Sequence, residues 1–151
     1  MIRSALTGLA ALALVVTVGC SDDAPEAGPS SAAVPVAYEV TQTWTIPNGG
    51  SGKAIVIPVA YLNDGPMAAL GEKLKNDTKG DRNAVIMIYA DAQAARLRDQ
   101  VLAGGATPTE SALYDKHFIG TYVRNANTGF HALEVCYGGF VPSVDCHNTK
   151  Y

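Results

Sequence analysis

The stretch NAVIMIYA, residues 83–90, is a nearly continuous run of apolar side chains in the middle of the chain. A short run of this kind predicts a central β-strand that is covered on both faces. The stretch KAIVIPVAY, residues 53–61, predicts a second strand, and Pro58 places that strand at a sheet edge or ends it early. We expect these two strands to form the middle of the fold.

The residues between the two strands have helical periodicity. Met67, Leu70 and Leu74 fall on one stripe of a helix expected over residues 65–76, with Asp64 as its cap. A strand, a helix and a second strand in this order form a βαβ unit. Such a unit pairs its strands in parallel through a right-handed crossover.

Further elements flank this unit on both sides. Asp91 predicts the start of one helix, whose buried stripe would be Ala94, Leu97, Val101 and Leu102. The sequence TPTE from Thr107 is a capping-box pattern that predicts the start of another helix. The remaining expected elements are a strand over 36–46, a loop over 47–52, helices over 92–103 and 108–116, and a hairpin of strands 117–124 and 130–137 about a turn at 125–129.

The expected element order is therefore β-β-α-β-α-α-β-β. This order predicts an α+β domain, with a mixed sheet of about five strands and two or three helices on one face. Residues 36–151 are expected to form this single globular domain, because 48% of the chain is hydrophobic and only 17% is charged. The net charge of −3 and the scattered basic residues give no reason to expect nucleic acid as a partner.

The N-terminus has the pattern of an export signal. Met1-Ile2-Arg3 supplies a positive start, residues 5–18 are almost wholly apolar, and Gly19-Cys20 follows at once. The apolar run is too short to span a bilayer and has the length of a signal-peptide core. Residues 1–20 resemble bacterial lipoprotein precursors, in which the signal peptide (here 1–19) is removed and the following cysteine is lipidated.

The resemblance implies that acylated Cys20 anchors the protein in a lipid bilayer. Residues 20–35 are rich in Asp, Ala, Ser, Gly and Pro, and we expect them to form a flexible tether. In this family an Asp after the cysteine often signals retention in the inner membrane, and this chain has Ser21. The resemblance therefore implies the periplasmic face of the outer membrane if the host is Gram-negative. The alternative is ordinary secretion with Cys20 as a free or paired thiol.

Two further cysteines, Cys136 and Cys146, are the right number for one disulfide bond outside the cytoplasm. The alternative, a metal site with His147 as a third ligand, has a spacing that matches no standard zinc pattern. We expect no metal site and no cofactor.

The most function-like stretch is the predicted hairpin loop with Arg124, Asn125, Asn127 and Thr128. It offers a guanidinium, two amides and a hydroxyl to a partner, and the alternative is a hairpin turn with a solvated Arg124. The surrounding stretch YVRNANTGFH, residues 122–131, with the helix and strand before it, resembles small exported bacterial proteins of uncharacterised function. That resemblance covers about residues 83–135 and implies no activity.

No arrangement of residues in the sequence identifies a catalytic site. We therefore expect a non-enzymatic, membrane-tethered binding domain of the cell envelope, whose expected partner is an envelope protein. A small hydrolase that uses Asp115, His117 or His131 is one alternative, and an assembly accessory is another. An exposed aromatic patch would favour a binding module. The candidates for such a patch are Trp44, Tyr61, Tyr89, Tyr114, Tyr122 and Phe140.

Overall fold

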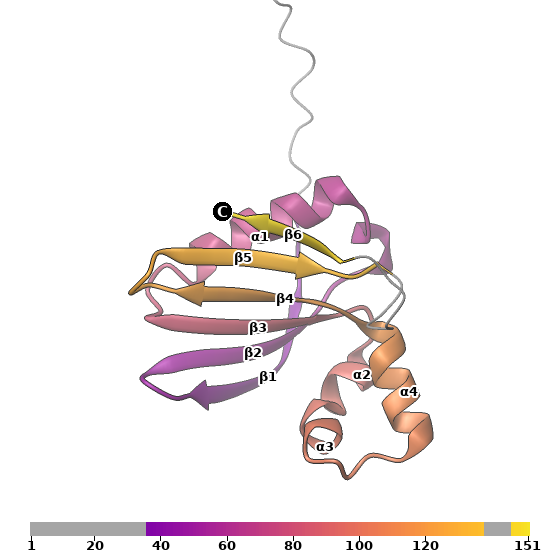
Figure 1. Cartoon of the computed structure of the whole chain (residues 1–151). Coiled ribbons are helices and arrows are strands. Elements are labelled where there is room, and N and C mark those ends of the chain that lie inside the picture. Colours follow the sequence, from indigo (N-terminus) through magenta and orange to yellow (C-terminus); the bar gives the residue numbers. More distant parts are fainter. Residues whose placement is uncertain (1–35, 138–145) are drawn as a thin grey trace, which may run out of the picture. The chain divides into compact units, whose positions relative to one another are not determined.

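The computed structural model describes residues 36–137 and 146–151, which form a mixed β-sheet with helices packed against it (Figure 1). Neighbouring strands are antiparallel except β2 and β3, which run parallel. The α+β class is confirmed, and the parallel pair is the one that the βαβ pattern predicted. In the described residues the strands lie in chain order: β1 (Glu39–Ile46), β2 (Gly50–Val56), β3 (Asn83–Tyr89), β4 (Phe118–Asn125), β5 (Phe130–Val135) and β6 (His147–Lys150).

The helices follow the sequence pattern in most places. The described segments contain a short 3₁₀ helix, η1 (Val59–Tyr61), and the α-helices α1 (Asp64–Asp77), α2 (Ala92–Arg96), α3 (Arg98–Leu102) and α4 (Pro108–His117). The predicted signal peptide (1–19), the lipidation site Cys20 and the tether (20–35) lie outside the described residues.

Helix α1 covers one face of the sheet with the stripe predicted from its sequence. Met67, Leu70 and Leu74 are buried in a cluster with apolar side chains from β2, β3, β4 and β5. The predicted cap at Asp64 is wrong, because Asn63 occupies the cap position and no side chain caps this helix. Asp64 Oδ1 instead accepts a hydrogen bond from the hydroxyl of Tyr137, at 3.1 Å.

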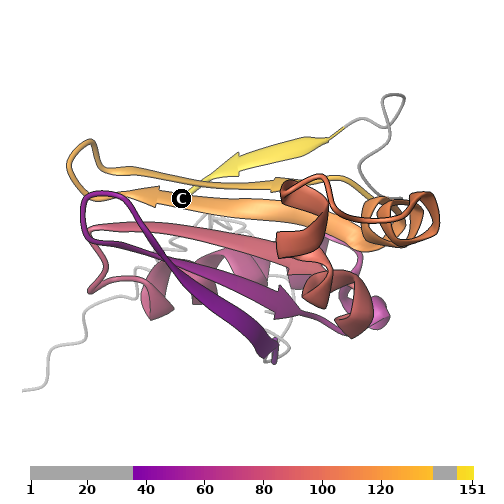
Figure 2. The same cartoon turned by 90° about the horizontal axis from the view of Figure 1, so that it is seen from below.

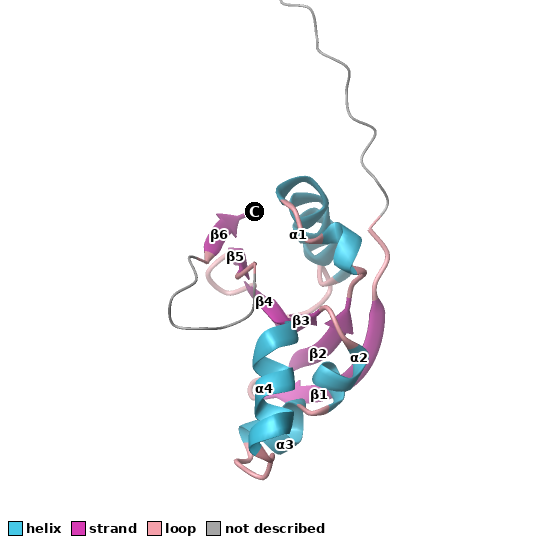
Figure 3. Ribbon diagram, turned by 90° about the vertical axis from the view of Figure 1, so that its right-hand side faces the viewer, coloured by secondary structure: helices cyan, strands magenta, loops and turns pink. Residues whose placement is uncertain are grey.

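Helices α2 and α4 pack against the opposite face, near the end of the sheet where β3 ends and β4 begins (Figures 2 and 3). Ala54 belongs to the cluster beneath these helices, whereas its neighbour Ile55 belongs to the cluster beneath α1. Successive side chains of a strand point to opposite faces, so the helices divide between both faces of the sheet. They do not gather on one face because β2 and β3 are apolar on both sides.

The helix expected over residues 92–103 divides at Leu97 into α2 and α3. Leu97 has a ψ of −10°, and its N–H is shared between the carbonyls of Gln93 and Ala94. Because a regular helix has a ψ near −42°, the chain changes direction here. Ala94 and Leu97 of the predicted stripe are buried, and Val101 still packs against the cluster beneath α2 and α4. Leu102 was predicted to be buried and is 60% exposed. The predicted caps of α2 and α4, Asp91 and Thr107, both form.

Strand β6 was not predicted, because its sequence HNTK contains no apolar side chain. It pairs antiparallel with β5, and the residue after it, Tyr151, lies against α1. A Cβ atom on Gly71 would overlap the Tyr151 ring, so glycine at this helical position makes room for that ring. The backbone N–H of Tyr151 also donates to the carbonyl of His131, at 3.1 Å.

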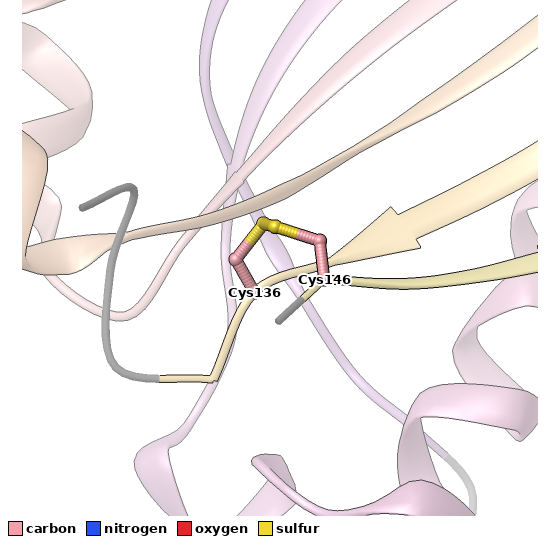
Figure 4. The surroundings of a disulfide bond; sticks show 2 residues. All are labelled: Cys136 and Cys146. Atoms are coloured by element: carbon pink, nitrogen blue, oxygen red, sulfur yellow. A yellow bond between two sulfur atoms is a disulfide. The ribbon is translucent and has the colours of Figure 1, made fainter. Parts of the chain in front are cut away.

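A disulfide bond joins Cys136, which follows β5, to Cys146, which precedes β6 (Figure 4). The predicted pairing is confirmed, and Cys136 is fully buried. The bond and the Tyr151 contact therefore hold the two ends of β6 against the domain.

We predict that the double substitution Cys136→Ser and Cys146→Ser lowers the free energy of unfolding by about 2.5–3 kcal/mol, because the unfolded chain regains the freedom of an open loop. Urea denaturation of the oxidised protein and of the variant measures this difference. Equal midpoints and equal slopes for the two proteins would show that the bond contributes nothing to stability.

We also predict that Gly52→Ala destabilises the protein by about 1–3 kcal/mol, because the added Cβ atom would overlap the indole of Trp44. Trp44 is the only tryptophan, and the Arg98 guanidinium lies over its ring, 3.4 Å from the ring centroid. Its fluorescence should shift to longer wavelength as it becomes more exposed. Gly80→Ala is the matched control, because no atom lies within 4 Å of a Cβ there. Equal effects of both substitutions would contradict the packing argument.

Candidate functional site

Polar side chains of the hairpin loop that was predicted to bind a partner form hydrogen bonds within the protein itself. Asn125 Oδ1 accepts a hydrogen bond from the N–H of Asn127 at 3.0 Å, and the hydroxyl of Thr128 lies 3.4 Å from the carbonyl of Asn125. Arg124 turns back over the domain and donates to the carbonyls of Asp81 and Lys79, at 3.1 and 3.3 Å. Arg124 therefore ties β4 to the segment between α1 and β3. A binding role for this loop stays a prediction.

His131 lies beside Arg124 on the face that α1 covers. Its Nδ1 is 3.1 Å from the hydroxyl of Tyr122 and 3.5 Å from Nη1 of Arg124. Because the guanidinium can only donate, this geometry favours Nδ1 as an acceptor and the proton on Nε2. Burial, with the positive charges of Arg124 and Lys75, lowers the pKa of His131 below its ordinary value.

The residues of the hydrolase alternative do not come together. Asp115 and His117 lie at the end of α4, just before β4 begins at Phe118. His131 pairs with Arg124 near the other end of β4. At about 3.3 Å a residue, the length of strand between these two ends is about 20 Å. Hence Asp115 and His117 cannot share a proton-transfer site with His131.

The sheet has one face that its helices leave partly open. Along β4 and β5, Tyr122 and Leu133 point toward α1, so Val123, Phe130 and Ala132 point to the opposite face. Helices α2 and α4 cover this second face only near the start of β4, and Figure 2 shows the remaining length of the strands without a helix over it. Phe130 is 41% exposed there. We call this surface of β4, β5 and β6 the open face.

A shallow hollow of about 290 Å³ lies on the open face. Apolar side chains from the hairpin and polar side chains from three strands meet in it. Its lining residues are Thr121, Val123, Phe130, Ala132, Glu134 and Asn148. An apolar surface with a few convergent polar groups is the usual composition of a binding site.

A second hollow, of about 410 Å³, lies where β1 begins and β2 ends. Its walls include Tyr38, Ile57 and Pro58, and its only charged lining residue is Glu39. The hydroxyl of Tyr38 is occupied, because it donates to Asp77 Oδ2 at 2.6 Å. This hollow therefore offers fewer free polar groups that could orient a ligand than the hollow on the open face.

The described aromatic residues that were candidates for an exposed binding patch belong to the core or pack against it. Tyr89, Tyr114 and Tyr122 are buried in the core. Tyr61 packs against the α1 cluster, Trp44 packs against the α2 and α4 cluster, and Phe140 lies outside the described residues. Sequence reasoning missed Phe130 and Val123. A signal for them is present in the sequence, because the hairpin strands carry apolar side chains on both faces. One face is covered by α1, and the apolar side chains of the other face are those of the open face.

No protein-family model, no curated protein and no solved structure matches the chain. Residues 36–137 and 146–151 contain no group of three His, Cys, Asp or Glu side chains placed to hold a metal ion. No helix within these residues is long and apolar enough to cross a membrane.

We predict that the protein loses stability as the pH falls below 6.5, the ordinary pKa of histidine. Because folding lowers the pKa of His131, the unfolded chain binds more protons between 6.5 and the folded-state value, and protonation there favours unfolding. The loss begins at the unfolded pKa and is complete below the folded one. Urea denaturation at several pH values between 7.5 and 5 measures it.

The substitution His131→Gln should flatten this pH dependence, because glutamine does not titrate. The substitution His117→Gln is the control and should leave the dependence in place. If the slope between pH 6.5 and 5 is the same in both variants, His131 is not its source.

Proposed function

We propose that this protein is a membrane-tethered lipoprotein of the cell envelope whose domain is a non-enzymatic binding module. The observation that carries the proposal is the open face of β4, β5 and β6, with the exposed Phe130 beside the hollow. Partly exposed apolar and aromatic side chains around a hollow are typical of an interaction surface. The partner is proposed to be another protein of the envelope.

The proposed tether rests on the sequence of residues 1–35. A signal peptide ending at Gly19 and lipid on Cys20 would anchor the chain, and residues 21–35 would hold the domain away from the bilayer. With Ser21 after the cysteine, the proposed location in a Gram-negative host is the periplasmic face of the outer membrane. A tethered domain searches a layer near the membrane, which raises its effective concentration for partners there.

Photo-crosslinking in living cells tests the proposed binding surface. A photoreactive amino acid in place of Phe130 should form a discrete crosslinked product with an envelope protein. The same group in place of Leu102 is the matched control, because Leu102 is also exposed and apolar but lies on α3. The product from position 130 should disappear when Val123→Asp is added, while the amount of folded protein stays the same.

Two outcomes would contradict the proposal. Identical products from both positions would show only general contact with neighbouring proteins. The absence of any product from position 130 in intact cells, with crosslinking confirmed on a known complex, would show that the open face is not an interaction surface.

A further inference from the structure

We infer that the hollow on the open face receives a basic side chain, arginine or lysine, from an extended segment of the partner protein. The inference rests on the proposed binding function and adds the chemistry of the partner. The hollow of about 290 Å³ lies at the lower limit for small-molecule pockets, so side chains of a protein segment suit it better than a larger ligand.

Glu134 supplies the charge that would attract a basic group. It is exposed, lines the hollow, and makes no ion pair or side-chain hydrogen bond within the described part of the chain. Asn148 lies directly opposite Glu134 on β6, and Thr121 lies opposite it on β4. The carboxylate therefore has an amide and a hydroxyl beside it that can complete the hydrogen bonds of a guanidinium or ammonium group.

The remaining walls suit the apolar part of a basic side chain. Val123 and Ala132 are paired residues on β4 and β5, and both line the hollow. The methylene groups of lysine and arginine pack against such surfaces while their charged ends reach a polar group. Phe130 lies four residues before Glu134 on the same face, about 13 Å away along the strand, and offers an aromatic surface to a neighbouring side chain of the same segment.

One positive charge on the open face opposes this attraction. Lys150 pairs with Ala132, which places it diagonally across from Glu134, and no ion pair joins the two side chains. Its removal should therefore strengthen the binding of a cation, whereas removal of the Glu134 charge should weaken it. The net charge of −3 for the chain adds a weak general attraction for basic partners.

Binding of a fluorescent peptide to the membrane-extracted protein tests the inference. The probe is acetyl-STFTSTRTSG-amide, in which the phenylalanine and the arginine are four residues apart on one face of an extended chain, about the 13 Å that separates Phe130 from Glu134. Its matched control has citrulline, which keeps the shape and removes the charge, in place of arginine. We expect the arginine peptide to bind about tenfold more tightly than the citrulline peptide, as measured by anisotropy at low salt.

The substitution Glu134→Gln should remove this preference, and Lys150→Gln should increase the affinity about twofold. Glu72→Gln, at an exposed position on α1, is the control and should change nothing. Equal binding of both peptides to the unsubstituted protein, or an unchanged preference in Glu134→Gln, would overturn the inference. If crosslinks still form from position 130 in that case, the binding face stands and only its preference for a basic side chain fails.

Discussion

The parallel pairing of β2 with β3 is the constraint on which the rest of the structure depends. A parallel pair requires a crossover, and that crossover places α1 on one face, where Leu70 and Leu74 join Ile55 and Ile86 in one buried cluster. The two strands are apolar on their other side as well, and α2 and α4 cover that side. Most of β4, with β5 and β6, extends the sheet beyond the reach of α2 and α4, which leaves the open face.

Much of this fold could be predicted from local pattern. The run of apolar residues at 83–90, the stripe on α1, and the caps Asp91 and Thr107 each reflect a physical requirement that acts over a few neighbouring residues. The disulfide pairing followed from there being two cysteines left once Cys20 was set aside. Where burial, hydrogen bonding and chain geometry agree locally, sequence reasoning and the structure agree too.

The features that were missed depend on contacts between distant parts of the chain. Strand β6 is polar and has no pattern of its own, so only its pairing with β5 and the contact of Tyr151 with Gly71 define it. The sequence pattern assigned Arg124 to the exposed hairpin loop. Its guanidinium instead donates hydrogen bonds to backbone carbonyls more than 40 positions away in the chain. The hollow combines side chains from three strands, and no single segment of sequence indicates that Asn148 of β6 and Thr121 of β4 line it together with Glu134 of β5.

The geometry gives separate roles to the two faces of the sheet. The α1 face holds the core and the Tyr122–His131–Arg124 hydrogen bonds, whereas the open face carries Phe130 and the carboxylate of Glu134, which has no ion-pair partner among the described residues.

Intact mass spectrometry of protein extracted from its native membrane tests most directly whether this domain is presented from a membrane by lipid. We predict a mass that lacks residues 1–19, carries added acyl groups and rises by two hydrogens on reduction. An unmodified full-length mass with three free thiols would contradict the lipid anchor and the disulfide together.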